Sequence, residues 1–157
     1  MTAKIIPIRK VTILSKNLKK QGQTIVLVGG CFDLLHLGHV TFLEKAKKMG
    51  NNLIVLLESD EKVMELKGIA RPIHTQRERA RILSALEVVD YVALLPYLKN
   101  NSQYDQLIGK IRPDVIAATS GDVNILHHKR SAKLTGAKLK LVTKMIGNYS
   151  TSRILNH

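Results

Sequence analysis

The chain has 157 residues, of which 45% are hydrophobic and only 4% aromatic, which suits one domain with an aliphatic core and argues against a disordered chain. Lysine and arginine outnumber acidic residues by 25 to 12, and the net charge of +13 favours an anionic partner, such as a nucleotide, a sugar phosphate, nucleic acid or an acidic protein. Cys31 is the only cysteine, which excludes a disulfide framework, and no apolar stretch approaches the roughly 18 residues of a membrane span, so we expect a cytoplasmic protein without a membrane partner.

Short apolar runs alternate with amphipathic segments along the chain. Runs of aliphatic and β-branched residues indicate strands covered on both faces, whereas apolar residues at three- to four-residue spacing indicate helices. Ser59 is a helix-capping residue, and Thr75 and Glu78 form a capping-box pattern. In chain order the sequence predicts a lead-in helix over 11–21, a strand over 24–28, a helix over 39–49, a strand over 53–57, a short helix over 59–66, a helix opening at Thr75, a strand over 91–95, a helix over 104–110, strands over 114–118 and 138–142, and a short helix opening at Ser150.

This order of elements predicts the fold class. Strands that alternate with helices form right-handed βαβ crossovers and a mostly parallel sheet with helices on both faces. We therefore expect an α/β protein with a Rossmann-like, doubly wound, five-stranded parallel sheet. One domain spans 1–157, with 1–22 as a lead-in segment and helix. Such sheets bind ligands at the carboxyl ends of their strands.

The stretch "GGCFDLLHLGHV" (29–40) lies at that edge, between the first predicted strand and a helix. His36 and His39 are three residues apart, so both rings can lie on one side of the first helical turn, where free backbone N–H groups favour an anion. Gly38 lets a base or a phosphate approach the backbone. Imidazole donors here would stabilise charge on the α-phosphoryl oxygens of a triphosphate. The alternative is a structural pair, with one histidine capping the helix and the other in the core.

Several motifs together resemble one family. "GCFDLLHLGH" (30–39) after the first strand and "YSTSRI" (149–154) after the last are similar to the two signatures of the cytidylyltransferase-like nucleotidyltransferase superfamily. Between them, "SDEKVMELKGIARPIHTQRERARILSALEVVDYV" (59–92) most resembles the nucleotidyltransferase domain of ADP-heptose synthase, an enzyme of lipopolysaccharide biosynthesis. The resemblance runs from about Lys10 through most of the chain. The chain is also similar to glycerol-3-phosphate cytidylyltransferase.

The resemblance implies a set of site residues. Those implied in catalysis are His36, His39 and Lys47. Those implied in nucleotide binding are Gly30, Cys31, Phe32, Gly38, Lys67, Arg79, Asp122, Ser150 and Thr151, and Arg71 is a further candidate for a phosphate contact. For the lysines and arginines the alternative is a solvated surface cation. Cys31 is expected to be a small packed residue, and Asp33 to orient the loop rather than to bind a metal.

The implied function is nucleotidyl transfer from a nucleoside triphosphate, ATP being favoured, to a phosphorylated sugar such as a heptose 1-phosphate, with release of pyrophosphate. Mg²⁺ is implied as a complex with the triphosphate, without dedicated protein ligands. Thr41 and Met145 stand where glycerol-3-phosphate cytidylyltransferase has basic residues, which weakens that alternative. Thr119 stands where the heptose enzyme usually has a lysine, which leaves the sugar open. An FAD-synthase-like adenylyltransferase would use the same core.

An alternative of another class is a basic protein that binds RNA or another polyanion and keeps a vestigial nucleotide site. The basic residues are scattered, with their densest run at 127–144, which does not favour a nucleic-acid partner. A homodimer is expected instead. Relatives with this core commonly pair, and the apolar residues at the two ends would gain burial from a partner. These residues are Ile5, Ile6, Ile8, Ile154 and Leu155.

Overall fold

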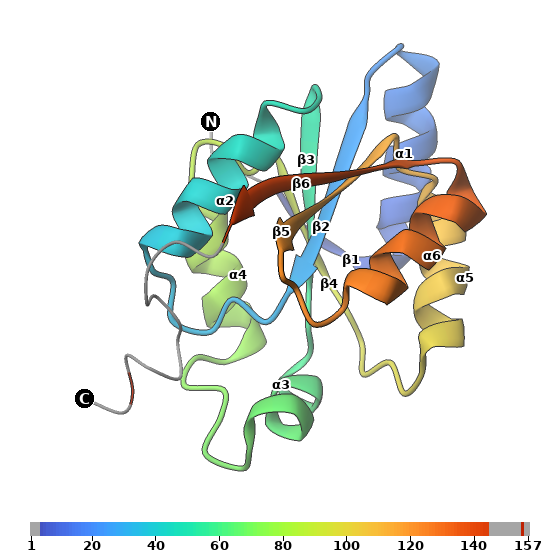
Figure 1. Cartoon of the computed structure of the whole chain (residues 1–157). Helices are drawn as coiled ribbons and strands as arrows, with labels where there is room; N and C mark the ends of the chain where they lie inside the picture. The colour runs from blue at the N-terminus through green and yellow to red at the C-terminus, as the bar shows by residue number, and fades with distance from the viewer. Residues whose placement is uncertain (1–3, 145–154, 156–157) are drawn as a thin grey trace.

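The computed structural model describes residues 4–144 and 155. They form an α/β domain whose single sheet has six parallel strands in the order β1-β4-β3-β2-β5-β6 (Figure 1). The strands are β1 (Lys4–Pro7), β2 (Ile25–Gly30), β3 (Asn52–Leu57), β4 (Tyr91–Leu94), β5 (Val115–Ser120) and β6 (Lys138–Lys144). The helices are α1 (Ile8–Lys20), α2 (Leu37–Lys47), α3 (Asp60–Lys67), α4 (Gln76–Ser84), α5 (Asn101–Ile111) and α6 (Ile125–Thr135). The α/β doubly wound prediction is confirmed.

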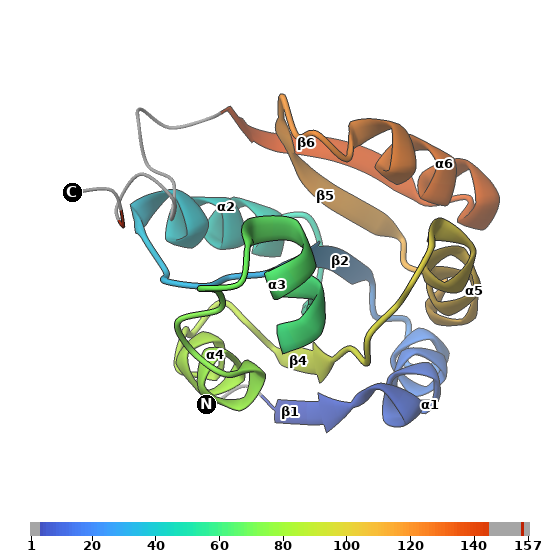
Figure 2. The same ribbon diagram turned by 90° about the horizontal axis from the view of Figure 1, so that it is seen from below.

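The central strands are buried on both faces because successive side chains point to opposite sides of the sheet. On β2, Val26 and Val28 pack in one core with residues of α2 and α4, whereas Ile25 and Leu27 pack in a second core with residues of α1, α5 and α6. The two views agree on these layers: α2 and α4 cover one face, and α1, α5 and α6 cover the other (Figure 2). The unbroken aliphatic runs in the sequence supply apolar side chains to both of these cores.

The predicted helix starts are also confirmed. The Ser59 side chain accepts a hydrogen bond from the Lys62 backbone N–H, and Thr75 and Glu78 form a reciprocal capping box. Both caps lie at the carboxyl-end edge of the sheet, where α3 begins directly after β3 (Figure 1). These caps therefore fix where α3 and α4 begin, next to the candidate site.

Two elements were missed. The sheet has a sixth strand, so the prediction of five was wrong: β1 is only four residues long and pairs with β4 from Lys4 opposite Tyr91. A strand this short carries too little pattern to be distinguished from a lead-in segment. Helix α6 lies within the basic run, and its only buried residues, Ser131 and Ala132, are too small to give an apolar periodicity. The helix predicted to open at Ser150 lies outside the described residues.

Within residues 4–144, no helix is long and apolar enough to cross a membrane.

Candidate active site

The turn between β2 and α2 has an uncommon backbone. Phe32 and Leu34 adopt left-handed φ angles of 46° and 58°, a conformation that side-chain-bearing residues adopt at a cost and that is concentrated at functional sites. Gly30 permits the turn, because a Cβ at this position would lie 2.9 Å from the Phe32 ring. That ring in turn tilts against His39 at a centroid distance of 5.4 Å. The turn thus fixes the imidazole beside the end of β2.

His36 and His39 cap α2 for each other. The Gly38 N–H donates to His36 Nδ1 (3.1 Å), the His36 N–H donates to His39 Nδ1 (3.3 Å), and the two rings stack 3.9 Å apart. Since each Nδ1 accepts a hydrogen bond, each neutral ring carries its proton on Nε2. The structural alternative and the functional one are therefore compatible: Nδ1 of each ring caps the helix, and Nε2 of each ring carries the N–H group.

Both imidazoles are neutral at pH 7. Burial lowers the pKa of His36, and burial, assisted by the charges of His36 and Lys67, lowers the pKa of His39 to about 4. The first turn of α2 contains no acidic residue. Two neutral N–H donors at a helix N-terminus are suited to bind a phosphate chain. No carboxylate in this turn competes with the phosphate for them.

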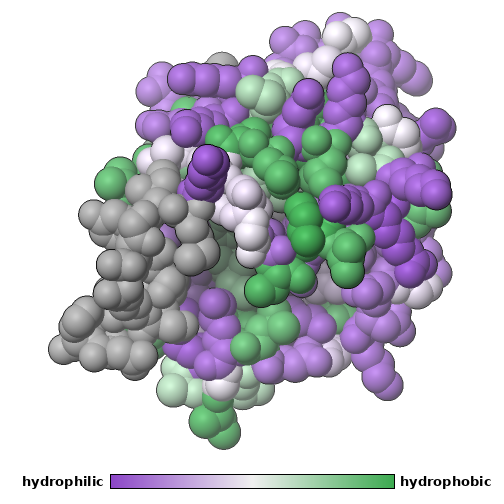
Figure 3. Space-filling model, viewed as in Figure 1, coloured by the Kyte–Doolittle hydropathy of each residue, from purple (hydrophilic) through white to green (hydrophobic). Residues whose placement is uncertain are grey.

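A cavity of about 210 Å³ lies between this turn and the ends of β5 and β6, and Figure 3 shows a hollow on this face of the molecule. The structure brings together seven of the predicted residues at its wall: Gly30, Cys31, Phe32, His36, Gly38, His39 and Asp122. Sequence reasoning did not assign Phe42, Thr119, His128, Thr143 or Lys144, which also line it. Ser150 and Thr151 lie outside the described residues.

The far wall of the cavity comes from β5, β6 and the start of α6. Asp122 accepts hydrogen bonds from the Asn124 N–H (2.8 Å) and pairs with His128 Nε2 (3.1 Å), and these partners, His128 foremost, lower the pKa of its carboxyl group. The hydroxyl groups of Thr119 and Thr143 lie 3.0 Å apart. This wall offers hydroxyl and carboxylate groups rather than cations, with Lys144 as the exception.

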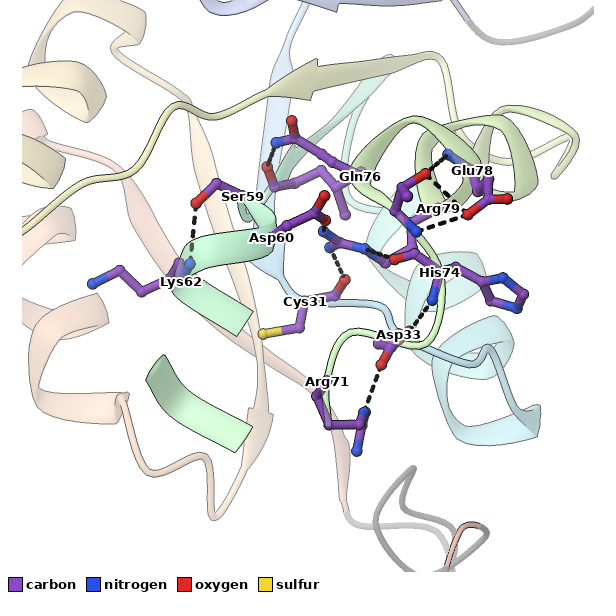
Figure 4. A network of polar contacts seen from close by, with 12 residues as sticks. Cys31, Asp33, Ser59, Asp60, Lys62, Arg71, His74, Gln76, Glu78 and Arg79 are labelled. Atoms are coloured by element: carbon purple, nitrogen blue, oxygen red, sulfur yellow. Dashed lines mark hydrogen bonds and ion pairs between the residues drawn. The ribbon is translucent and has the colours of Figure 1, made fainter. Parts of the chain in front are cut away.

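Asp33 holds the loop that follows α3. Its carboxylate accepts hydrogen bonds from Arg71 Nε (2.6 Å) and from the backbone N–H groups of Ile73 and His74 (Figure 4). Arg71 and Asp33 are both almost fully buried. The prediction that Asp33 orients a loop is confirmed. Arg71, a candidate for a phosphate contact, donates its Nε–H to Asp33 instead.

Arg79 was predicted to contact phosphate, and the structure places its side chain within the protein. Its side chain is 1% exposed, and all three of its nitrogens are used. Nε donates to the His74 carbonyl (3.0 Å), NH1 to the Cys31 carbonyl (2.6 Å), and NH2 to Asp60 (2.7 Å), as Figure 4 shows. Arg79 therefore joins α4, the β2–α2 turn and α3 from within the protein, where a phosphate would have to displace these partners.

Lys47 was predicted to act with the histidines, but the structure places it at the other end of α2. Lys47 is the last residue of α2, eight residues from His39 and thus roughly 12 Å further along the helix axis. Its ammonium group pairs with Asp90 at 2.6 Å, and the same Asp90 oxygen accepts the Leu53 N–H. Lys47 therefore fastens the amino-end edge of the sheet, opposite the cavity.

Lys67 is the predicted cation that does lie near the site. It ends α3, and its charge opposes the rise that burial causes in the pKa of Cys31 and adds to the fall in the pKa of His39, so it lies within electrostatic reach of both. Within residues 4–144, no ion pair or hydrogen bond occupies its exposed ammonium group. It is available to an anionic ligand.

The two lysines can be compared directly. We expect Lys67→Met to lower kcat/KM for the reaction proposed below by at least about tenfold, since a charge-assisted contact to phosphate is worth roughly 1.5–3 kcal/mol. Lys47→Met is the matched control and should leave kcat/KM within about twofold while modestly lowering the free energy of unfolding. Steady-state kinetics and urea unfolding of both variants test this. Equal kinetic losses would contradict the assignment.

The remaining groups of the site are the carboxylates of Asp33 and Asp122, as possible metal ligands, and the Cys31 thiol, as a possible nucleophile. No group of three or more His, Cys, Asp or Glu residues in the described ranges could hold a metal ion. The Asp33 and Asp122 carboxylates are engaged by protein donors, so this donor set does not form a magnesium cage. Burial raises the pKa of the Cys31 thiol, which stays protonated and is not an activated nucleophile.

Comparison with known proteins identifies the family. The family model described as cytidylyltransferase-like matches residues 27–154. The chain belongs to the cytidylyltransferase-like family. It is 43% identical over 141 residues to the bifunctional protein HldE of Methylobacillus flagellatus, a match that covers 89% of this chain and 28% of that protein. The HldE of Desulfatibacillum aliphaticivorans is 41% identical over 114 residues, covering 73% and 22%.

This cytidylyltransferase-like chain thus spans about a quarter of the length of the curated relatives it matches. Among solved structures, it resembles the lipopolysaccharide core biosynthesis protein of Thermoplasma volcanium, with a TM-score of 0.62 and 27% identity over 82% of this chain and all of that one. The pantoate-beta-alanine ligase of Francisella tularensis shares the fold alone, with a TM-score of 0.66 and 16% identity over 99% of this chain and 73% of that one. The chain is a nucleotidyltransferase-like domain homologous to part of HldE.

Proposed function

We propose that this protein transfers a nucleoside monophosphate from a nucleoside triphosphate, ATP being favoured, to a phosphorylated sugar such as a heptose 1-phosphate. The observation that carries the proposal is the reciprocal capping of His36 and His39. It holds two neutral imidazole rings, each with its proton on Nε2, side by side at a helix N-terminus, on the wall of a cavity. Preorganised donors of this kind stabilise charge that develops on phosphoryl oxygens.

The reaction needs no protein nucleophile. A phosphate oxygen of the acceptor attacks the α-phosphorus in line, the bond from that phosphorus to the α–β bridging oxygen breaks, and pyrophosphate leaves with the bonding electrons. His36 and His39 donate to the α-phosphoryl oxygens, and Lys67 and Lys144 neutralise the phosphates. The acceptor phosphate is already anionic, which agrees with a site whose Cys31 thiol is not activated.

We propose an orientation of the nucleotide along the two walls of the cavity. The phosphates lie against the donor-rich turn, and the nucleoside extends toward Asp122 and Thr119. Mg²⁺ enters as part of the substrate, bound mainly by triphosphate oxygens, because the described residues do not offer a cage for it. Ser150 and Thr151 are proposed to bind the distal phosphates, as the family resemblance implies.

A pyrophosphate-release screen tests the function. ATP, CTP, GTP and UTP are each combined with sugar phosphates, polyol phosphates and FMN. We expect the highest rate with ATP and a heptose 1-phosphate. A preference for CTP with glycerol 3-phosphate, or for ATP with FMN, would replace this substrate assignment with one of the alternatives. No release from any pair, together with RNA binding that survives physiological salt, would favour the polyanion-binding alternative.

We also propose a homodimer, by analogy with relatives of the same core. Ile6 and Ile8 pack against the core of this chain and do not need a partner for burial, whereas Ile5 and Leu155 are exposed. A mass of one 17.5 kDa chain in light scattering, with and without nucleotide, would contradict the dimer.

A further inference from the structure

A carboxylate at the end of β3 is not used by the site described above. Glu58 follows the last residue of β3, and its backbone N–H donates to the Gly30 carbonyl at 3.1 Å, directly beside the turn that lines the nucleotide cavity. Its side chain is half-buried. The Tyr104 hydroxyl, which comes from α5, donates to both carboxylate oxygens at 2.8 and 2.9 Å. Two elements that are 46 residues apart thus converge to fix one carboxylate.

This carboxylate is held in an unfavourable setting. Burial raises the pKa of Glu58, and no lysine or arginine in the described ranges comes within ion-pair distance of it. Lys62, one turn along, is instead paired with Glu65 at 2.9 Å. A partly desolvated carboxylate with a single protein donor has unused acceptor capacity, since its two oxygens offer about four lone-pair sites.

The position of Glu58 relative to β2 decides what it can meet. The nucleotide cavity is lined by β2, β5 and β6, whereas Glu58 follows β3, on the other side of β2. Cys31 lies between the two: it lines the cavity, and the charge of Glu58 acts on its thiol. The positive charge of Lys67 affects the pKa of both Cys31 and His39, so this cation lies near the part of the cavity wall that these two residues form. Figure 4 shows the Cys31 thiol directed away from Arg71 and Arg79.

In the proposed reaction, an acceptor whose phosphate lies near Lys67 and His39 can reach the α-phosphorus. Its remaining atoms would then extend away from the nucleoside, toward Cys31 and Glu58. A carboxylate accepts charge-assisted hydrogen bonds from hydroxyl groups, and vicinal hydroxyls can use both of its oxygens.

We propose that Glu58, positioned by Tyr104, binds hydroxyl groups of the acceptor and sets the preference for a polyhydroxylated phosphate. This inference rests on the proposed function. Glu58 is a specificity-determining residue, not a general base, because the attacking phosphate oxygen has no proton to remove. Tyr104 is a positioning residue that acts through Glu58.

Binding of a sugar phosphate tests the proposal without requiring turnover. Heptose 1-phosphate is titrated by calorimetry into the wild type and into Glu58→Gln, Tyr104→Phe and the control Glu65→Gln, each saturated with a non-hydrolysable ATP analogue. We expect Glu58→Gln to raise the acceptor Kd by at least about tenfold, as loss of hydrogen bonds to a charged group does. Tyr104→Phe should raise it less, and Glu65→Gln should leave it within about twofold. The Kd of the ATP analogue should stay within about twofold in all variants.

Mono-deoxy analogues of the acceptor provide the second measurement. The analogue that lacks the recognised hydroxyl should bind the wild type as weakly as the full acceptor binds Glu58→Gln, with no further loss in that variant. An unchanged acceptor Kd in Glu58→Gln, or no acceptor binding to the wild type, would overturn the inference. If acceptor binding depends on Glu58 but no pyrophosphate is released, the inference stands and the proposed reaction fails.

Discussion

His39→Ala is expected to lower kcat for nucleotidyl transfer by at least about a hundredfold, because it removes an Nε2–H donor that acts mainly on charge developing in the transition state. His36→Ala should have a similar effect. Each change also removes half of the reciprocal cap, which costs about 1 kcal/mol and leaves the fold intact. Rapid-quench or steady-state kinetics, with circular dichroism of each variant, measures both effects.

Two further histidine variants separate capping from catalysis. His36→Asn keeps a side-chain acceptor that favours the N-cap, so it should restore stability but not turnover. His74→Ala is the control, because the His74 ring is directed away from the network in Figure 4 and does not line the cavity. Near-normal kcat in His39→Ala, or an equal loss in His74→Ala, would refute the phosphate-binding role of the pair.

Arg79→Ala is expected to lower the free energy of unfolding by about 3–5 kcal/mol, since it leaves buried carbonyl groups without donors and opens a cavity. The Cys31 and His74 carbonyls lose their guanidinium partner, and Asp60 loses its ion pair. Because the free energy of unfolding of a natural domain is only about 5–15 kcal/mol, this variant is close to the limit of folding.

Arg79→Lys supplies the second measurement. A single ammonium cannot replace three differently directed N–H groups, so urea unfolding should give an intermediate loss of stability. The nucleotide Kd of the folded fraction should change little. A variant with normal stability and strongly weakened ATP binding would instead restore Arg79 as a phosphate ligand.

The sequence predicted the layered fold because its main signals are local. The aliphatic runs of β2 and β3 and the capping box at Thr75 are each contained in a few residues, and the structure confirms them. Helix α6 was missed because Ser131 and Ala132 leave no apolar stripe. Patterns that depend on large side chains at a fixed period can be recognised without a structure, and patterns of small ones cannot.

The site was predicted in part for a related reason. His36 and His39 are three residues apart in sequence and stacked in space, so their spacing was informative. Lys47 matched a motif position, but a rise of about 1.5 Å per residue already takes it to the other end of α2. The Arg79 contacts to Cys31 and the Tyr104 contact to Glu58 join residues 48 and 46 positions apart, and no local pattern encodes such pairs.

The central claim is that a nucleoside monophosphate, including its α-phosphorus, moves from the triphosphate to an acceptor phosphate. ATP labelled with ³²P at the α-phosphorus and incubated with heptose 1-phosphate and the protein tests it most directly. The account predicts that the label appears in a nucleotide-linked sugar in equal amount to the pyrophosphate released. Label recovered only as unreacted ATP, or as free AMP or ADP whether or not the acceptor is present, would contradict it.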